Sequence, residues 1–244
     1  MTLTVLGVIP ARLKSTRLPR KVLRDIGGRP MIVHVYERAR QASSLGELLV
    51  ATDAEEVLQV CGRFGIPAVM TSPDHLSGTD RVWEVAQSHR ADVYVNIQGD
   101  EPLLSPRHIE RLLEPFHTRP ETQVSTLCIR ATDAELASLQ VNKVVLDIQG
   151  RALYFSKYPI PFDRDGLGVV RYKHAGFYAY RKAALETFHR LPASSLERAE
   201  ALEQLRFLEN GIPIVVMETD EPTIGVDTEE DLRAVEAHLA SRRA

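Results

Sequence analysis

Five cationic side chains stand close together near the start of this sequence, and their spacing suits a phosphate-binding loop. They lie in the run IPARLKSTRLPRKVL, residues 9–23, as Arg12, Lys14, Arg17, Arg20 and Lys21. The run follows a short apolar segment that predicts a buried strand, so the charges would lie in a loop at a strand end. Backbone N–H groups and fixed charges in such a loop can hold a polyanion. A solvated basic loop without a ligand is the alternative interpretation.

Two acidic segments far along the chain favour the phosphate-binding interpretation. The segment NIQGDEP, residues 96–102, places Asp100 after an apolar run, and IGVDT, residues 224–228, places Asp227 between a short apolar run and a predicted helix. Both carboxylates are therefore expected at the edge of an α/β sheet where ligands bind. Two carboxylates there would suit Mg²⁺, which completes its coordination with water and substrate phosphates. Taken singly, each aspartate also fits an ordinary turn or helix-start residue.

The elements that would position these side chains follow the pattern of a parallel sheet covered on both faces. Apolar runs typical of buried strands occur at residues 3–9, 48–51, 68–70 and 93–97. Segments of helical periodicity alternate with them, and an amphipathic helix is predicted after Ser105. Helix starts are indicated by the capping spacing of Asp53 with Glu56 and of Thr132 with Glu135. The first half is therefore predicted to be α/β.

The middle of the chain predicts an antiparallel lobe. Strand-like runs at 143–148 and 151–155 flank Gln149-Gly150, and an alternating run at 172–180 follows a loop at 159–168 that contains proline and glycine. Ser194 with Glu197 is expected to open one long helix that ends near Gly211. A strand at 214–217 and a final helix, capped by Thr228 with Asp231, return the chain to the α/β pattern.

Composition limits the possible function classes. The 244 residues are 44% hydrophobic and carry a formal net charge of −3, so no overall attraction to nucleic acid or to an acidic membrane is expected. Cys61 and Cys128 are far apart and lack metal-ligand spacing, which argues against a disulfide framework and a zinc site. No apolar run approaches the ~20 residues that cross a bilayer. These features predict a cytoplasmic protein without a nucleic-acid or membrane partner.

Seven segments, taken in order, resemble those of the 3-deoxy-manno-octulosonate (Kdo) cytidylyltransferases. They are IPARLKSTRLPRK, MTSPDHLSGTDR (70–81), NIQGDEP, KVVLDIQGRALYFSK (143–157), KHAGFYAYR (173–181), LEQLR (202–206) and GVDTEEDL (225–232). The resemblance covers nearly the whole chain, which makes it far more specific than one short motif. It implies a mixed, mostly parallel α/β sheet with helices on both faces and a small antiparallel lobe for sugar binding and dimerisation.

The resemblance also implies the residues of the site. Those implied for CTP are Pro10, Ala11, Arg12, Arg17, Lys21, Ser77, Gly78 and Thr79. Those implied for the sugar are Gln98, Lys157, His174, Tyr178, Glu203 and Gln204. Asp100 and Asp227 would hold Mg²⁺, and together with Lys21 they form the implied catalytic set. The residues themselves leave a second interpretation open, because His174 and Tyr178 share one face of an alternating strand and LEQLR fits an amphipathic helix, so both segments could simply be packed.

Two positions depart from the family pattern. The family usually has glycine where this chain has Arg20, so the loop gains a charge and loses the residue best suited to positive φ. It usually has arginine where this chain has Lys157, and lysine keeps the positive charge but not the two-pronged geometry that grips a carboxylate. The identity of the sugar acid therefore depends on position 157.

The resemblance implies that the anomeric hydroxyl of Kdo attacks the α-phosphorus of CTP, giving CMP-Kdo and pyrophosphate for lipopolysaccharide synthesis, by a homodimer. The alternatives are a cytidylyltransferase for another 2-keto sugar acid, such as an 8-amino Kdo analogue or a sialic acid, and a non-catalytic nucleotide-binding module. One nucleotidyltransferase domain, residues 1–244, is expected. Its nucleotide- and metal-binding core would comprise residues 1–135 and 210–244, and its sugar-binding and dimerisation lobe residues 140–209.

Overall fold

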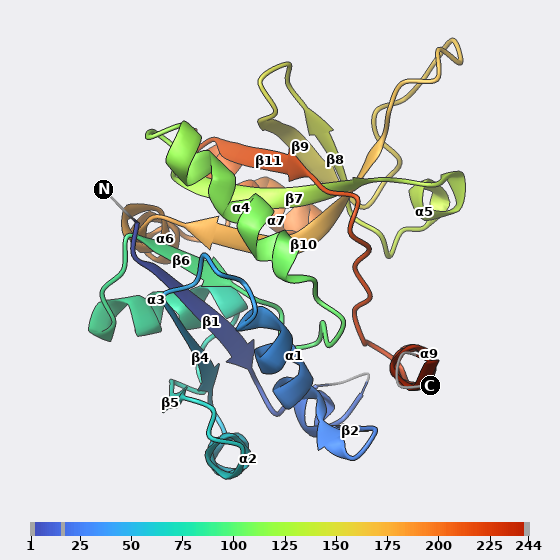
Figure 1. Cartoon of the computed structure of the whole chain (residues 1–244). Coiled ribbons are helices and arrows are strands. Elements are labelled where there is room, and N and C mark those ends of the chain that lie inside the picture. The colour runs from blue at the N-terminus through green and yellow to red at the C-terminus, as the bar shows by residue number, and fades with distance from the viewer. Residues whose placement is uncertain (1–2, 16–17, 242–244) are drawn as a thin grey trace. The chain divides into compact units, whose positions relative to one another are not determined.

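The computed structural model describes residues 3–15 and 18–241 (Figure 1). Contacts within the chain group it into two compact units. The first comprises Met1–Glu110 and Thr223–Ala244, and the second comprises Arg111–Pro222. The predicted division into a core of residues 1–135 and 210–244 and a lobe of residues 140–209 stays a prediction.

A parallel sheet forms the centre of the first unit. Its strands lie in the order β6 (Val93–Asn96), β1 (Val5–Ala11), β4 (Glu47–Thr52) and β5 (Ala68–Met70) (Figure 1). These runs are almost wholly apolar because strands of a parallel sheet are buried on both faces, and Val8 in β1 is 0% exposed. The four predicted strands are confirmed, with β1 displaced by two residues from the predicted 3–9.

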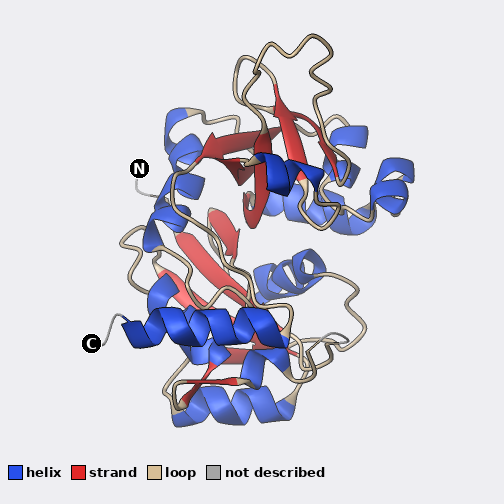
Figure 2. Cartoon of the chain, turned by 90° about the vertical axis from the view of Figure 1, so that its right-hand side faces the viewer, coloured by secondary structure: helices blue, strands red, loops and turns tan. Residues whose placement is uncertain are grey.

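Helices separate these strands along the chain (Figure 2). They are η1 (Lys21–Leu23), α1 (Met31–Ala39), α2 (Glu55–Arg63), α3 (Gly78–Ser88), α4 (Pro106–Thr118), which leads into the second unit, and α9 (Glu229–Ser241). The predicted cap of α9 is confirmed, since the Thr228 hydroxyl accepts a hydrogen bond from the Asp231 backbone N–H at 3.2 Å. The predicted cap formed by Asp53 and Glu56 is wrong: α2 has Ala54 at its N-cap, without a side-chain hydrogen bond.

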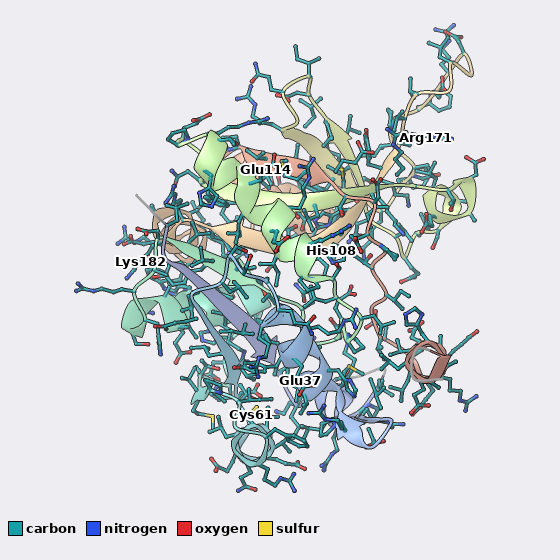
Figure 3. All side chains as sticks on the ribbon, viewed as in Figure 1. Glu37, Cys61, His108, Glu114, Arg171 and Lys182 are labelled. Atoms are coloured by element: carbon teal, nitrogen blue, oxygen red, sulfur yellow. The ribbon has the colours of Figure 1, made fainter. Side chains whose placement is uncertain are left out.

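A short hairpin completes the first unit beside η1. It consists of β2 (Asp25–Ile26) and β3 (Arg29–Pro30), joined through Gly27 and Gly28 at positive φ. Arg29 donates hydrogen bonds of 2.8 and 2.6 Å to the two carboxylate oxygens of Glu37. Glu37 lies on α1 and is labelled in Figure 3. This two-pronged ion pair ties the hairpin that follows the basic loop to α1.

The second unit is built around a mixed sheet. Here β7 (Val124–Arg130) pairs antiparallel with β10 (Tyr172–Tyr180) and parallel with β11 (Ile214–Glu218). The hairpin of β8 (Lys143–Leu146) and β9 (Ala152–Ser156) joins β10 through β8, again antiparallel. The helices are α5 (Asp133–Ala137), α6 (Lys182–Arg190), α7 (Ser195–Glu200) and α8 (Leu205–Glu209). The predicted antiparallel lobe and the capping box of Thr132 with Glu135 are confirmed.

The predicted single helix from Ser194 to near Gly211 is wrong. The Glu197 carboxylate does accept a hydrogen bond from the Ser194 backbone N–H at 3.0 Å, and a helix opens there as predicted. That helix, α7, ends at Glu200, because Ala201 adopts a left-handed conformation with φ 53° and ψ 46° that no α-helix can continue. The chain resumes helical structure at α8, so the LEQLR segment begins in a turn.

Candidate active site

A lysine and two aspartates converge in the first unit. Asp100 lies in the turn after β6, Asp227 precedes α9, and Lys21 opens η1. The Lys21 ammonium donates to Asp100 Oδ2 at 2.5 Å and to Asp227 Oδ1 at 2.9 Å. The two carboxylates therefore lie on either side of one positive charge, although 127 sequence positions separate Asp100 from Asp227.

Backbone and apolar contacts hold these side chains in place. The Val226 N–H donates to the Asp100 carbonyl at 2.9 Å, which fixes the segment of one aspartate against that of the other. Val226 belongs to a buried apolar cluster that joins the basic loop, the hairpin, α1 and α9; its members are Leu18, Ile26, Met31, Leu103, Val226, Leu232 and Val235. The short apolar run before Asp227, residues 223–226, does not form a strand of the sheet.

The charges at this centre are arranged to accommodate a cation. Burial lowers the pKa of Lys21, but the charges and hydrogen bonds of Asp100 and Asp227 outweigh it, and the pKa is raised overall. The position of the ammonium demonstrates that both carboxylates can contact one cation, which is the fit a divalent metal bound by few protein oxygens requires. No cluster of three or more His, Cys, Asp or Glu with metal-site geometry occurs among the described residues.

Three segments approach one another at the end of β1. A Cβ atom on Gly99 would lie 2.7 Å from the Pro10 carbonyl oxygen, and one on Gly78 would lie 3.5 Å from the Pro10 ring. At Gly99 only a residue without a side chain permits this close approach of backbone, whereas the distance at Gly78 is an ordinary van der Waals contact. The structure thus brings together the predicted nucleotide residues Pro10 and Gly78, with Ser77 capping α3 through a 3.1 Å hydrogen bond from the Asp80 N–H.

Of the remaining predicted nucleotide residues, Ala11 and Arg12 follow Pro10 directly, and Thr79 follows Gly78. Ala11, at the end of β1, and Thr79, in α3, are buried, and Arg12 is exposed. Arg17 lies outside the described residues. Positive charge at the carboxyl end of a parallel strand is an arrangement that favours phosphate.

Asp53 connects two of these segments and was not identified as a site residue from the sequence. Its Oδ1 accepts from the Leu13 N–H of the basic loop at 3.4 Å, and its Oδ2 accepts from Arg81 of α3 at 3.1 Å. Arg81 is 3% exposed, so its charge is matched inside the protein. The available signal was the position of Asp53 directly after β4, at the same sheet edge as Asp100; the capping interpretation obscured it.

The second unit places His174 and Tyr178 on one face of β10. Their ring centroids are 5.4 Å apart, and the Phe155 ring packs edge-on against His174 at 5.0 Å. His174 Nε2 lies 2.9 Å from the Thr126 hydroxyl. Burial lowers the pKa of His174 to about 3, so the imidazole is neutral at neutral pH and contributes hydrogen bonding without charge.

The other predicted sugar residues are divided between the units. Gln204, at the N-cap of α8, is 4% exposed, and its buried Nε2 has no hydrogen-bond partner among the described residues. An unsatisfied buried amide donor is costly and is typical of a group that awaits an acceptor. Glu203 is half-buried beside it, Lys157 follows β9, and Gln98 belongs to the first unit after β6.

Comparison with known proteins assigns the chain to a family. A cytidylyltransferase family model matches residues 6–218. A 3-deoxy-manno-octulosonate cytidylyltransferase of Acidobacterium capsulatum is 58% identical, over 99% of this chain and 99% of the relative, and one of Escherichia coli is 47% identical, over 97% and 96%. The chain belongs to the 3-deoxy-manno-octulosonate cytidylyltransferase family. A solved structure of CMP:2-keto-3-deoxy-manno-octonic acid synthetase complexed with CTP superposes with a TM-score of 0.95 at 46% identity, covering 98% of this chain and 99% of that one.

The departure from the family pattern at Arg20 has a structural consequence. Arg20 adopts φ 59° and ψ 31°, the left-handed conformation in which the glycine usual for the family is unstrained. Its guanidinium pairs with Glu56 of α2, with both side chains largely exposed. An exposed ion pair offsets at most a small part of the backbone strain.

Arg20→Gly is therefore expected to be more stable than Arg20→Ala by about 1 kcal/mol, because both variants lose the ion pair and only glycine relieves the left-handed strain. Urea unfolding of the two variants measures the difference directly. Equal stability of the two, or a more stable alanine variant, would show that the loop backbone is not strained at this position.

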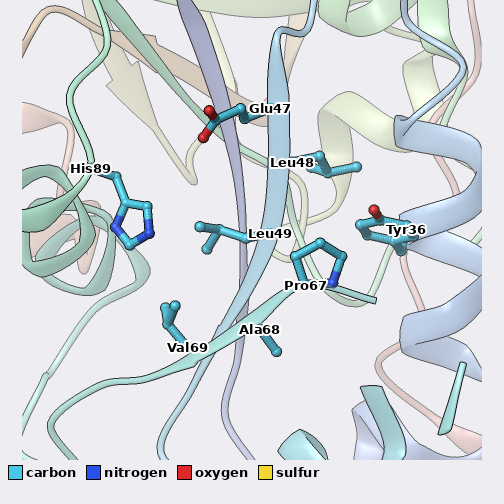
Figure 4. Close-up of a pocket in the computed structure, with 8 residues that line it drawn as sticks. All are labelled: Tyr36, Glu47, Leu48, Leu49, Pro67, Ala68, Val69 and His89. Carbon is cyan, nitrogen blue, oxygen red and sulfur yellow. The ribbon is translucent and has the colours of Figure 1, made fainter. Parts of the chain in front are cut away.

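A cavity of about 460 Å³ in the first unit lies away from these residues (Figure 4). It is lined by Tyr36, Glu47, Leu48, Leu49, Pro67, Ala68, Val69 and His89. Glu47 begins β4, so the cavity adjoins the amino end of that strand, whereas Asp53 and Asp100 follow the carboxyl ends of β4 and β6. Ligands of open α/β sheets bind at the carboxyl ends, and this cavity contains none of the predicted site residues.

Proposed function

We propose that this protein transfers CMP from CTP to the anomeric hydroxyl of Kdo, giving CMP-Kdo and pyrophosphate. The main observation in support is that Lys21, Asp100 and Asp227 lie together beside the basic loop. The Lys21 ammonium donates hydrogen bonds to Asp100 Oδ2 at 2.5 Å and to Asp227 Oδ1 at 2.9 Å. A non-catalytic nucleotide-binding module would have no need of two carboxylates that share one cation. Full-length similarity to cytidylyltransferases supports the same conclusion.

The basic loop binds and orients the triphosphate in this proposal. Arg12, Arg17 and Lys21 supply positive charge to the phosphates and to the pyrophosphate as it leaves. The backbone of Pro10 and Ala11 lines the nucleotide, and Ser77, Gly78 and Thr79 enclose it at the start of α3. The hydrogen bonds from Leu13 and Arg81 to Asp53 fix the loop against α3, so the two halves of the nucleotide site keep a constant spacing.

Asp100 and Asp227 would hold Mg²⁺, the proposed cofactor. When bound, Mg²⁺ lowers the cost of deprotonating a coordinated hydroxyl and stabilises negative charge on phosphate. Lys21 pairs with both carboxylates in the structure and offsets one of their two negative charges, and with CTP present its ammonium would contact the phosphates instead. No covalent intermediate with the protein is required.

The second unit supplies all of the proposed sugar contacts except Gln98, which belongs to the first unit. The neutral imidazole of His174 and the hydroxyl of Tyr178 hydrogen-bond to sugar hydroxyls, and the buried Gln204 amide gains an acceptor. Gln98 and Glu203 bind further hydroxyls, and Lys157 pairs with the sugar carboxylate. The Lys157 ammonium makes no hydrogen bond or ion pair with any of the residues described in the structure, so it is available for this role.

Assembly and cellular role are proposed on separate grounds. Large apolar side chains of the second unit are exposed, namely Ile148, Leu153, Tyr158, Phe162 and Leu167. Exposed apolar surface favours association, and we propose that these side chains contact a second copy of this chain, which sedimentation velocity tests. We further propose that the protein acts in the cytoplasm, in lipopolysaccharide synthesis. None of the described helices is long and apolar enough to cross a membrane.

The sugar specificity is tested with a panel of acids. Purified protein with CTP and Mg²⁺ is expected to release pyrophosphate with Kdo and much more slowly with 8-amino Kdo or N-acetylneuraminate. If the protein bound CTP tightly but released no pyrophosphate from it with any of these acids, it would be a nucleotide-binding module instead. A marked preference for 8-amino Kdo or a sialic acid would replace Kdo as the substrate.

Lys157 variants refine this assignment. Lys157→Ala is expected to lower kcat/KM for Kdo, because a charged hydrogen bond to the sugar is lost. The decrease corresponds to a loss of about 1.5 to 3 kcal/mol of transition-state stabilisation. Lys157→Arg should preserve or improve kcat/KM for Kdo, and KM for CTP should barely change in either variant. Steady-state kinetics with each substrate varied in turn measures both effects. If Lys157→Arg instead switched the preference from another sugar acid to Kdo, position 157 would set a different specificity.

A further inference from the structure

Both peptide groups of Lys157 are held by charged side chains. Its backbone N–H donates to Glu200 Oε2 at 3.0 Å, and its carbonyl accepts from the Lys143 ammonium at 2.6 Å. Residues at the end of a strand, where ladder hydrogen bonds stop, normally leave such groups to water. Here two ionisable residues from different elements fix the backbone immediately before and after the Lys157 side chain.

Lys143 is a fully buried lysine, 0% exposed, in β8. Its Nζ donates to the carbonyls of Ser138 and Lys157 at 2.6 Å each and to that of Val141 at 2.8 Å. An ammonium has three N–H donors and a neutral amine only two, so three carbonyl acceptors are satisfied only by the charged form. Burial lowers the pKa of Lys143, and the charge of Glu200 acts in the opposite direction. All three of these acceptors are backbone carbonyls, so the hydrogen bonds of the ammonium hold main chain in place.

Glu200 is the last residue of α7 and joins this strand end to the helix pair. Its Oε1 accepts from the Ser156 hydroxyl at 2.7 Å while Oε2 holds the Lys157 N–H. Ala201 follows in the strained left-handed conformation, which turns the chain toward Glu203 and Gln204. Strain of this kind is retained where the surrounding structure specifies it, often at functional sites. Glu200 therefore links the segment of Lys157 to the turn that presents two other proposed sugar residues.

We propose that Lys143 and Glu200 are positioning residues that fix the backbone on both sides of Lys157 and so aim its ammonium at the carboxylate of the sugar acid. This inference rests on the proposed sugar contact of Lys157. This positioning matters because Lys157 replaces the arginine that is usual for the family. A flexible lysine ammonium loses more conformational freedom on binding than a planar guanidinium does, so a fixed backbone at position 157 contributes more to binding.

Double-mutant cycles with Lys157→Ala test the inference. Glu200→Gln and Lys143→Met are each expected to lower kcat/KM for Kdo by about tenfold or more, with KM for CTP changed less than about twofold, because only the sugar carboxylate contact is misplaced. In a Lys157→Ala background, the further loss from either change should shrink to less than about threefold. Glu209→Gln is the matched control, since Glu209 accepts from the Ser195 hydroxyl and the Leu196 N–H in the same helix pair without touching Lys157.

The possible outcomes distinguish the positioning role of Lys143 and Glu200 from the proposed contact between Lys157 and the sugar carboxylate, on which that role depends. If Lys157→Ala alone leaves kcat/KM for Kdo unchanged, the proposed carboxylate contact is wrong. If Lys157→Ala impairs Kdo use but Glu200→Gln is fully additive with it, or weakens CTP and Kdo use equally, Glu200 is merely structural and the positioning role is overturned. Should Lys143→Met fail to fold, the Glu200 cycle decides alone, with Glu200→Asp expected to retain more Kdo activity than Glu200→Gln.

Discussion

Asp100→Asn and Asp227→Asn are each expected to lower kcat by about 10³-fold, roughly 4 kcal/mol of barrier, while the protein remains folded. An amide oxygen is a much poorer ligand than a carboxylate for a hard divalent cation. Both aspartates are partly exposed at 30% and 44% of their side-chain surface, and each contacts Lys21, so replacement by a group of the same shape creates no cavity. Pyrophosphate release at saturating CTP and Kdo, with circular dichroism as the folding check, measures the effect.

Glu229→Gln is the matched control for this prediction. Glu229 lies two residues after Asp227 and pairs with Arg24 at 2.6 Å at the exposed start of α9. Glu229→Gln removes one negative charge from the same segment. Because Glu229 does not contact Lys21, near wild-type turnover is expected. A folded Asp100→Asn or Asp227→Asn variant that kept wild-type rates at saturating Mg²⁺ would remove that carboxylate from the catalytic set.

The second large effect is expected from Lys21→Ala, which should lower kcat/KM for CTP by about 10²- to 10³-fold through loss of one phosphate-binding charge. The variant also leaves Asp100 and Asp227 without their shared counter-charge. Tyr178→Phe and Glu203→Gln should act mainly on Kdo, because these residues belong to the second unit. Titration with CTP and steady-state kinetics with each substrate varied separate the two classes of variant.

Lys14→Ala controls for net charge in the same loop. Lys14 is exposed and forms no ion pair within the described residues, so its removal should weaken CTP use far less than the removal of Lys21. Unchanged CTP binding and turnover in Lys21→Ala would contradict the phosphate-loop interpretation. Equal losses in Lys14→Ala and Lys21→Ala would show that the loop acts only through its overall charge.

Much of the fold was predictable because local patterns and tertiary packing agree. Continuous apolar runs fixed the positions of β4, β5 and β6, and strict alternation predicted β10 with the bounds it has in the structure. The approach of Asp100 to Asp227 could be anticipated from the sheet-edge rule for ligand sites. The likeness of seven separate segments to one family added the reaction and the substrate class, which no local pattern could supply.

Other features depend on long-range contacts that a sequence does not display. Ala201 adopts a left-handed conformation but does not have a side chain typical of turns, so the local sequence does not predict the break between α7 and α8. Asp53 has the spacing of a helix cap, yet its partners Leu13 and Arg81 lie 40 and 28 positions away. Lys143 resembles an ordinary strand lysine until β9 places the Lys157 carbonyl beside its ammonium. In each case tertiary geometry overrides the local signal.

The most direct test of the account is a ³¹P NMR time course of the wild-type protein with CTP, Kdo and Mg²⁺. One CMP-Kdo and one pyrophosphate are expected to appear for each CTP consumed, and omission of Kdo or chelation of the metal is expected to stop the formation of both. Consumption of CTP without CMP-Kdo, or formation of pyrophosphate in the absence of Kdo, would contradict it.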